Sequence, residues 1–328
     1  MTMTLPLAVY FVGLVGGILV IALASTVSVT NIITISEKRR LSKSVLGFLL
    51  VAFSTSLPEL FVAVNAIIIG NMSVSLGDLL GSNITNICLI IGLSLVVGTT
   101  FNHKRDVTIR ESESKEFITG LMLLSITLLS LLYIQYISQL IGVLLLGIFV
   151  SYSYILIRRR KIVEEEISPS PTGGSIKKQV YLIILGLAGV IISAKIVLES
   201  AIQIATFFDI PASVIGATVV ALGTSLPELA VDTRAAYRGY LNLAMGDIVG
   251  SCFLNSTLIL GILLVFTPFQ VNVLVLSDLI LFSVVSNLLL WYAIDTGRLK
   301  TNFGLLLLVL YAVNVLSLLG IIQLRPNF

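Results

Sequence analysis

Two glutamates occupy the same place in two copies of a six-residue motif. T-S-L-P-E-L runs over Thr55–Leu60 and recurs over Thr224–Leu229, so Glu59 and Glu228 each lie near the middle of a long apolar segment. An ionised carboxylate at membrane depth costs a few kcal/mol or more unless it is paired. We find no basic residue in the repeated segments that could pair with these glutamates, and we therefore predict that their partner is a bound cation.

A second duplicated motif supplies further oxygen atoms. G-D-x-x-G-S-x-x-x-N begins at Gly77 and again at Gly246, so that an acid, a serine and an asparagine recur at four-residue steps. This spacing puts each trio on one helix face. The six residues are Asp78, Ser82, Asn86, Asp247, Ser251 and Asn255. Sodium and calcium prefer sites made only of oxygen ligands, whereas soft metals need thiolate or imidazole. Cys88, Cys252 and His103 do not converge in the sequence.

The prolines and the charge count refine this prediction. Pro58 and Pro227 lack a backbone donor, which should free or distort the carbonyls near Ser54 and Gly223 for a ligand. Two glutamates balance one divalent ion, whereas about three monovalent ions would leave one positive charge over. Such an exchange would respond to voltage by about 2.3 kcal/mol per charge per 100 mV.

The composition predicts the elements that hold these residues. The chain has 328 residues, of which 57% are hydrophobic and 11% charged, and its mean hydropathy is +1.07. These values exclude a water-soluble enzyme and indicate an all-α membrane protein surrounded by the lipid bilayer. Ten transmembrane helices are predicted: Pro6–Ile35, Ser44–Ile69, Val74–Thr99, Phe117–Ile134, Ser138–Ile157, Gln179–Ala205, Pro211–Tyr237, Leu241–Val265, Val273–Ile294 and Asn302–Ile322.

The basic residues predict how these helices are oriented. All but Lys195 and Arg325 of the 20 lysines and arginines fall in alternate loops, and such loops are typically cytoplasmic. We therefore predict that both termini lie outside (N-out/C-out) and that the first helix is retained. The polar segment 158–178 is predicted to be a cytoplasmic linker between a first five-helix repeat, residues 1–157, and a second, residues 179–328.

The two repeats are predicted to have inverted topology. Gly47–Gly92 aligns without a gap on Gly216–Gly261 at a constant offset of 169 residues. Because five is an odd number, the second copy must enter the membrane from the opposite side. Inverted pairs of broken helices are typical of secondary transporters that alternate access around a midplane site.

The paired motifs, with T-S-L-P-E in each half and G-x-x-x-G-S reaching an asparagine, resemble the sodium/calcium exchanger family of the cation/calcium exchanger superfamily. The resemblance implies a sodium/calcium antiporter that exchanges about three Na+ for one Ca2+, in agreement with the charge count. It also implies that the first and sixth helices slide as a gate against the other eight.

The resemblance also implies a set of ion ligands. Glu59, Glu228, Asn86 and Asn255 would form a central diamond, with one calcium site made chiefly by the two glutamates. The flanking sodium sites would use hydroxyls and carbonyls of Thr55, Ser56, Ser82, Thr224, Ser225, Ser251, Ala52 and Ala221.

The sequence departs from the family pattern at a few positions. Asn255 stands where the potassium-dependent branch carries Asp, which favours the potassium-independent type. Asp78 and Asp247 stand where many members have Asn, and each is predicted either to cap a helix, with Asp247 able to pair with Arg234 or Arg238, or to attract ions at the mouth.

Three further side chains have predicted roles of their own. Asp232 is expected to serve the cytoplasmic mouth or to pair with arginine. Lys195 and Glu199, four residues apart, are expected to form an ion pair within one helix.

Several other functions were weighed. A midplane glutamate can exchange a metal for a proton, so a calcium (cation)/proton exchanger is the alternative function, although T-S-L-P-E favours sodium over the G-N-x-x-E motif of proton-coupled relatives. The residues around Asp78 and Asp247 lack the G-x-G-D and Y-D motifs of intramembrane proteases, so the chain is not expected to be an enzyme. Buried acids on inverted helices suggest an occluding carrier rather than a channel.

The expected partners and location follow from this function. We expect Na+ and Ca2+ as substrates, a multi-pass location in the cell membrane and no cofactor. Neither nucleic acid nor an obligate protein partner is expected.

Overall fold

A computed structural model describes most of the chain. The described residues are 7–39, 47–69, 72–101, 111–133, 136–137, 139–165, 176–207, 221–266, 269–270 and 273–318. The first half contains α1 (Leu7–Arg39), η1 (Gly47–Val51), α3 (Ala52–Thr55), α4 (Leu57–Ile69), α5 (Met72–Ile84), η2 (Thr85–Ile91), α6 (Gly92–Phe101), α7 (Glu111–Tyr133), β1 (Tyr136–Ile137) and α8 (Gln139–Glu165). The second half contains α9 (Ile176–Phe207), α11 (Ala221–Thr224), α12 (Leu226–Tyr237), α13 (Leu241–Leu254), η4 (Asn255–Ile259), α14 (Leu260–Phe266), β2 (Phe269–Gln270), α15 (Val273–Asp295) and α16 (Thr301–Leu318).

The helical character predicted from composition is confirmed. Each of the ten predicted segments overlaps a helix or a series of consecutive helices. Among the described residues, 6 helical stretches are long and apolar enough to cross a membrane on their own, and Leu57–Ile68, Phe117–Thr127 and Leu279–Asp295 are shorter apolar helices. The number of crossings, the inverted topology and the outside position of both termini stay predictions.

Helices α8 and α9 extend into the predicted linker, residues 158–178, from both sides. Helix α8 continues past Ile157 to Glu165, and α9 already begins at Ile176, so only residues 166–175 lie outside the described part of this segment. Arg160 and Lys161 stand four residues before Glu164 and Glu165, a spacing at which opposite charges support a helix. The polar composition that suggested a flexible linker is therefore compatible with a helix that extends beyond its apolar part.

The helices that carry the duplicated motifs are broken at matching positions. α3 ends before Ser56 and α4 starts after it, while α11 and α12 are separated in the same way by Ser225. Both serines have nearly the same backbone angles, φ −81° and ψ 9° for Ser56 and φ −85° and ψ 6° for Ser225. Pro58 and Pro227 follow two residues later, where a missing N–H and a bulky ring disfavour a continuous helix.

Wider π-helical turns interrupt the helices that carry the second motif. η2 follows α5 and η4 follows α13, so that Asn86 lies within one π-segment and Asn255 begins the other. Such turns are rare and occur frequently at functional sites, because the extra residue changes the direction of the side chains that follow.

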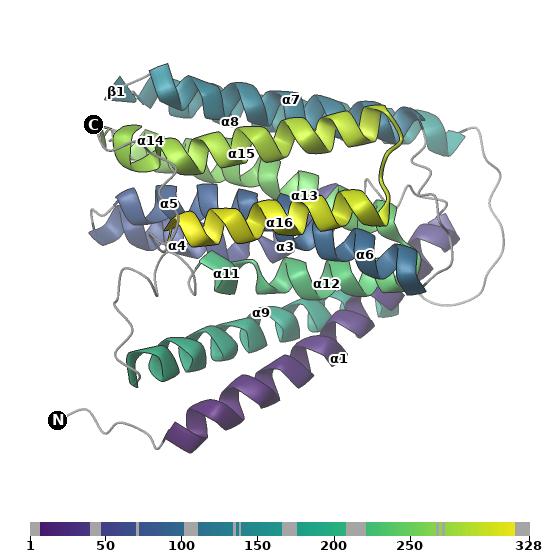
Figure 1. The fold of residues 1–328 in the computed structure, drawn as a ribbon. Coiled ribbons are helices and arrows are strands. Elements are labelled where there is room, and N and C mark those ends of the chain that lie inside the picture. Colours follow the sequence, from purple (N-terminus) through teal and green to yellow (C-terminus); the bar gives the residue numbers. More distant parts are fainter. Residues whose placement is uncertain are drawn as a thin grey trace.

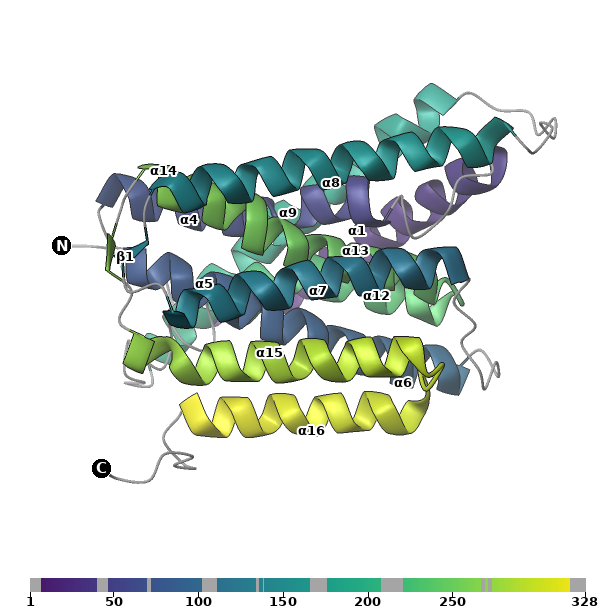
Figure 2. The same cartoon turned by 90° about the horizontal axis from the view of Figure 1, so that it is seen from above.

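Helix α13 lies in the middle of the bundle (Figure 1). In Leu241–Phe266, 83% of the most apolar 18-residue stretch is buried inside the protein. In Thr301–Leu318 of α16, the buried share is 17%. α1 and α9 run together along one side, at the bottom of Figure 1, and α7 and α8 lie at the opposite edge of that view. α15 and α16 lie next to each other along another side, at the bottom of Figure 2. The helices that carry the duplicated motifs are thus packed between α1 and α9 on one side and α15 and α16 on another.

Segments from the two halves of the chain make close contacts. A Cβ atom added to Gly250 of α13 would lie 2.8 Å from both the Cα and the carbonyl oxygen of Phe48 in η1. One added to Gly142 of α8 would lie 2.8 Å from the carbonyl oxygen of Gly261 in α14. Only a residue without a side chain allows such an approach. The short strands β1 and β2 also pair across the halves, antiparallel, with Tyr136 opposite Gln270.

Candidate ion-binding site

The predicted ligands are buried in the interior of the bundle. Every one whose side chain the structure describes is at most 3% exposed: Ala52, Thr55, Ser56, Glu59, Ser82, Asn86, Thr224, Ser225, Glu228, Ser251 and Asn255. Ala221 begins α11, next to Thr224 along the helix, and its side chain is not among those described. The carbonyl oxygen of Ala52 accepts the backbone N–H of Ser56 at 3.0 Å, so it is already engaged in one hydrogen bond.

Residues of the two halves meet at Glu228. Its Oε1 accepts hydrogen bonds from the hydroxyl of Ser56, in the first half, at 3.3 Å and from that of Ser251, in the second half, at 3.4 Å. Ser56 lies three residues before Glu59 at the break between α3 and α4. The two copies of the T-S-L-P-E motif, 169 residues apart in the sequence, are therefore in direct contact.

Glu59 has fewer partners than its counterpart. It is 0% exposed, and among the residues that the structure describes neither of its carboxylate oxygens has a well-formed hydrogen bond, although the hydroxyl of Ser82 is near. Its charge interacts with the carboxylates of Glu228 and Asp78, both of the same sign. A buried carboxylate without partners and near other acids is costly, and a positive ion would relieve both the desolvation and the repulsion.

Two helix ends also favour negative charge at this place. Glu59 lies in the first turn of α4, and Glu228 lies in the first turn of α12. The N-terminus of a helix carries a partial positive charge from unpaired N–H groups, which stabilises an acid there by about 0.3–1 kcal/mol. This is less than the cost of burying a carboxylate, so the helix ends reduce the need for a cation without removing it.

The predicted roles of Asp78 and Asp247 as helix caps are wrong. α5 begins at Met72 and α13 at Leu241, so that both acids lie in the second turn of their helices. Asp247 is 0% exposed, and its Oδ1 lies 3.3 Å from the hydroxyl of Thr55 and 3.4 Å from that of Ser251, whose one proton can go to Asp247 or to Glu228.

The predicted ion pair of Asp247 with Arg234 or Arg238 is also wrong. Arg238 donates to the hydroxyl of Thr30 at 2.8 Å. Arg234 lies 5.4 Å from the centroid of the Tyr237 ring. Both arginines are on or next to the last turn of α12, whereas Asp247 lies deeper, against the first half.

Instead, each aspartate contacts a threonine of the other half. Thr224 donates to Oδ1 of Asp78 at 3.1 Å. The hydroxyl of Thr55 lies 3.3 Å from Oδ1 of Asp247 and 3.1 Å from the carbonyl oxygen of Val51, so its one proton can go to either acceptor. A threonine that donates its proton to a carboxylate leaves its oxygen lone pairs available to a cation. The spacing of the duplicated motifs contains this signal, because each threonine recurs together with an aspartate 23 residues later.

The two asparagines are held differently. Asn86 has no hydrogen-bond partner for either side-chain atom. Asn255 donates from Nδ2 to Oδ1 of Asn83 at 3.3 Å, which leaves its own Oδ1 without a partner. Asn83 in turn donates to the hydroxyl of Ser256 at 3.0 Å. Sequence reasoning missed this positioning role of Asn83, although its replacement by Cys252 in the second copy was a visible asymmetry.

Two remaining predictions have different outcomes. Lys195 and Glu199 form the predicted ion pair, with Nζ 3.7 Å from Oε1, and both side chains are exposed. Asp232 was expected at the mouth or against an arginine, but it is 0% exposed and its carboxyl group lies within hydrogen-bond reach of that of Asp247. Its charge interacts with those of Asp247 and Glu228.

The arrangement offers oxygen atoms of several kinds. Unpartnered atoms include both oxygens of Glu59, Oε2 of Glu228, Oδ1 of Asn86 and of Asn255, and the hydroxyl of Ser225. No group of three His, Cys, Asp or Glu side chains that could hold a metal ion was found within the described ranges. A cation here would therefore have to combine the glutamate pair with neutral amide, hydroxyl or carbonyl oxygens, which suits sodium and calcium.

The comparisons with known families agree with this chemistry. The family model described as sodium/calcium exchanger protein matches residues 9–158 and 178–320. The sodium/calcium exchanger MaX1 of Methanosarcina acetivorans is 32% identical over 342 aligned positions, which cover 93% of this chain and 97% of that protein. An uncharacterized membrane protein of Methanocaldococcus jannaschii, MJ0091, is 30% identical and covers 87% of this chain and 89% of its own.

The fold also matches solved structures. A structure of the sodium-calcium exchanger NCX_Mj, soaked with Na+ and Ca2+, superimposes with a TM-score of 0.81 at 26% sequence identity. The match covers 97% of this chain and 99% of that one. The likeness therefore includes both halves and all the segments that carry the duplicated motifs.

Proposed function

This chain belongs to the sodium/calcium exchanger protein family, and on that premise we propose that it exchanges Na+ for Ca2+ across the membrane that it spans several times. The family consists of transporters and not of enzymes. The observation that carries the proposal for this chain is the buried contact between the two T-S-L-P-E motifs, where Ser56 donates to Glu228 and neither carboxylate oxygen of Glu59 accepts a well-formed hydrogen bond from a described residue. A bound cation is the partner that this contact lacks.

In the proposed mechanism, Glu59 and Glu228 bind one Ca2+, with the amide oxygens of Asn86 and Asn255 beside them. The two negative charges of the glutamates balance one calcium ion. The buried carboxyl groups of Asp78, Asp232 and Asp247 lie beside them and make the surroundings of the site more favourable to cations. About three sodium ions at the same place carry one further positive charge, which makes the exchange electrogenic.

The flanking hydroxyls form the proposed sodium sites. Their residues are Thr55, Ser56, Ser82, Thr224, Ser225 and Ser251, joined by the carbonyls of Ala52 and Ala221. Asp78 and Asp247 orient Thr224 and Thr55 by accepting their protons, so that the threonine oxygens face the ion through their lone pairs. The aspartates then act on sodium through the threonines, not as direct ligands of calcium.

Alternating access requires a part of the protein that moves. α1 packs along most of α9, and Ile21 of α1 and Val197 of α9 form a hydrophobic cluster of their own, apart from the main core. Leu226 and Ala230 of α12 pack against this cluster. We propose that the α1–α9 pair slides over α12 as the gate, because the side chains packed there are easier to rearrange than the glycine–backbone contact of α13 with η1.

A flux experiment tests the coupling ion. Purified protein in vesicles loaded with sodium should accumulate labelled calcium when the vesicles are diluted into sodium-free buffer, because the outward sodium gradient drives calcium inward. An inside-positive voltage, set with potassium and valinomycin, should speed this uptake, because about three Na+ leave for each Ca2+ that enters and one net positive charge moves outward. An inside-negative voltage should slow it, so the two measurements give the sign of the charge moved. Uptake driven by a pH gradient and not by a sodium gradient would replace the proposal with calcium/proton exchange.

Replacing either aspartate with asparagine should weaken ion binding only moderately. Asp78→Asn and Asp247→Asn keep an oxygen that accepts the threonine proton but remove a charge, and we expect the apparent KM for sodium or calcium to rise by about tenfold or less. Asp247→Asn should have at least as large an effect as Asp78→Asn, because Asp247 contacts Ser251 and Asp232 in addition to its threonine. Asp295→Asn, on the exposed end of α15, is the matched control. Complete loss of transport in Asp78→Asn would instead make Asp78 a direct ion ligand.

A further inference from the structure

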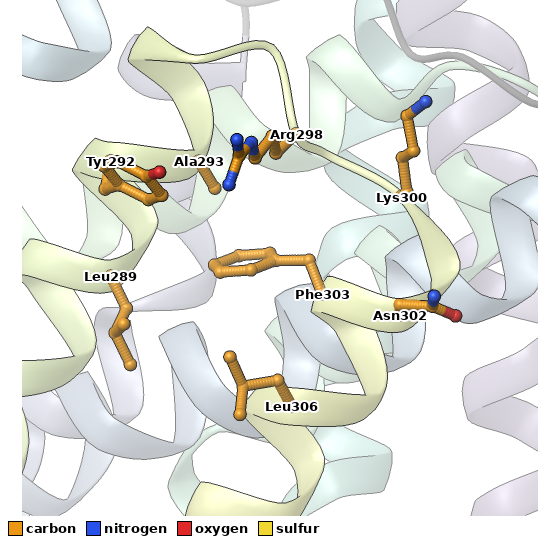
Figure 3. Close-up of a pocket in the computed structure, with 8 residues that line it drawn as sticks. All are labelled: Leu289, Tyr292, Ala293, Arg298, Lys300, Asn302, Phe303 and Leu306. Atoms are coloured by element: carbon orange, nitrogen blue, oxygen red, sulfur yellow. The ribbon is translucent and has the colours of Figure 1, made fainter.

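A cleft opens between the end of α15 and the start of α16, far along the chain from the duplicated motifs. Its volume is about 520 Å³, and its walls include Leu289, Tyr292, Arg298, Lys300, Phe303 and Leu306. Figure 3 shows the aliphatic side chains of Leu289 and Leu306 at one end and the guanidinium of Arg298 near the Tyr292 ring at the other. The cleft therefore has a basic end and an apolar end.

The basic end is held in place by local structure. The guanidinium carbon of Arg298 lies 5.6 Å from the centroid of the Tyr292 ring, a distance at which a cation is attracted to the ring face. Gly297, with φ of 65°, allows the tight turn that brings Arg298 back beside α15. The walls contain no acidic residue, and Asp295, the nearest acid in the sequence, is exposed outside them.

The cleft also lies at the depth where a membrane meets water. α16 is an apolar helix long enough to cross a bilayer, and Leu279–Asp295 of α15 is a shorter apolar helix. The turn between them begins where α15 ends at Asp295. Leu305, Leu306 and Val309 are 49%, 49% and 60% exposed, so the outer face of α16 is available to lipid chains. Basic pockets between apolar helices at this depth bind anionic lipid headgroups.

We propose that this cleft binds an anionic phospholipid, with its phosphodiester at Arg298, where Lys300 adds a second positive charge to the wall, and an acyl chain along Leu289, Phe303 and Leu306. The charge complementarity selects a lipid with net negative charge over a zwitterionic one. The apolar end distinguishes a lipid from a free phosphate, which would contact only the basic end.

A lipid bound in this cleft would stabilise the packing of α16 next to the candidate ion site. Thr301, the first residue of α16, shares a hydrogen bond of 2.7 Å with Thr99 of α6. α16 packs against both α6 and η2, the π-segment that contains Asn86. A lipid that holds α15 and α16 together should therefore stabilise the folded protein, whether or not the ion site is occupied.

The first test compares lipids by thermal unfolding. In nanodiscs, replacing phosphatidylcholine with a mixture containing phosphatidylglycerol should raise the Tm of the native chain by about 2–5 °C. The variant Arg298→Gln/Lys300→Gln should lose this increase. Lys177→Gln/Lys178→Gln, which removes the same charge from exposed residues of α9, should keep it. An increase retained in the first variant, or lost equally in the second, overturns the proposal.

The second test concerns the apolar end. Leu306→Ala should reduce the Tm increase produced by phosphatidylglycerol, whereas Leu305→Ala should not, because Leu305 is equally exposed but outside the cleft. Inorganic phosphate added to phosphatidylcholine nanodiscs should have no effect. Equal behaviour of the two leucine variants, or an equal increase with phosphate, would show that no lipid is bound here. These measurements need no transport and can fail while sodium/calcium exchange is confirmed.

Discussion

Glu228→Gln should abolish sodium-dependent calcium uptake, with a loss of at least about 100-fold. The substitution keeps the size of the side chain and an oxygen that can accept from Ser56 and Ser251, but it removes one of the two charges that balance calcium. Removing one partner from a buried charge pair costs about 3–5 kcal/mol, and each 1.4 kcal/mol is roughly a factor of ten. Uptake of labelled calcium into sodium-loaded vesicles measures the loss.

Glu59→Gln should have an equally large effect on transport but a different effect on stability. Because both oxygens of Glu59 lack partners, the neutral amide should make the ion-free protein more stable, and its Tm without ions should not fall. Glu199→Gln, at an exposed position of α9, is the control and should transport normally. Transport near the native rate in either buried variant would show that the two glutamates do not form the ion site.

Gly250→Ala should destabilise the folded protein, because the new methyl group would lie 2.8 Å from backbone atoms of Phe48. Real Cβ atoms do not approach backbone so closely, and α13 would have to move away from η1. Overpacking of this kind costs about 1–3 kcal/mol, which corresponds to a decrease in Tm of roughly 5 °C. Thermal unfolding in detergent measures it.

Gly77→Ala is the matched control for this packing prediction. Gly77 is also a helical glycine in a duplicated motif, but a Cβ added there meets nothing within 4 Å. Alanine favours a helix over glycine by about 1 kcal/mol, so the Tm should be unchanged or slightly higher. If the two substitutions lowered the Tm equally, close packing of α13 against η1 would not explain the effect.

The positions of most helices could be predicted from the sequence. Long apolar segments separated by charged loops are the strongest pattern that a sequence contains, and the predicted segment Leu241–Val265 corresponds to α13, η4 and α14 within one residue at its end. The breaks at Ser56 and Ser225 also follow from local chemistry, because the prolines act on their own helices.

The π-segments and the pairing of β1 with β2 could not be predicted. A π-turn depends on one extra residue in a helix, which leaves the hydrophobic pattern of η2 or η4 almost unchanged. The pairing of Tyr136 with Gln270 joins residues far apart in the sequence. Both features depend on tertiary packing rather than on local propensity.

For the candidate site, the sequence predicted which residues are buried but not all of their roles. The acids, hydroxyls and amides were visible because they recur, and the structure places them inside the bundle. Asp78 and Asp247 were assigned to helix starts although they lie four and six residues after the predicted starts at Val74 and Leu241, whereas a capping acid must stand at the first turn. Their hydrogen bonds to Thr224 and Thr55 connect opposite halves, and such contacts cannot be derived from either half alone.

These contacts between the halves have a consequence for biosynthesis. When the ribosome has completed the first half, Asp78 still lacks Thr224, and Gly142 of α8 has no α14 to pack against. Until the later helices are inserted, the early helices are therefore in the membrane with polar side chains such as Asp78 that lack their final hydrogen-bond partners. The chain between α8 and α9 connects the halves during this interval. The contacts that stabilise the complete protein are the ones that form last.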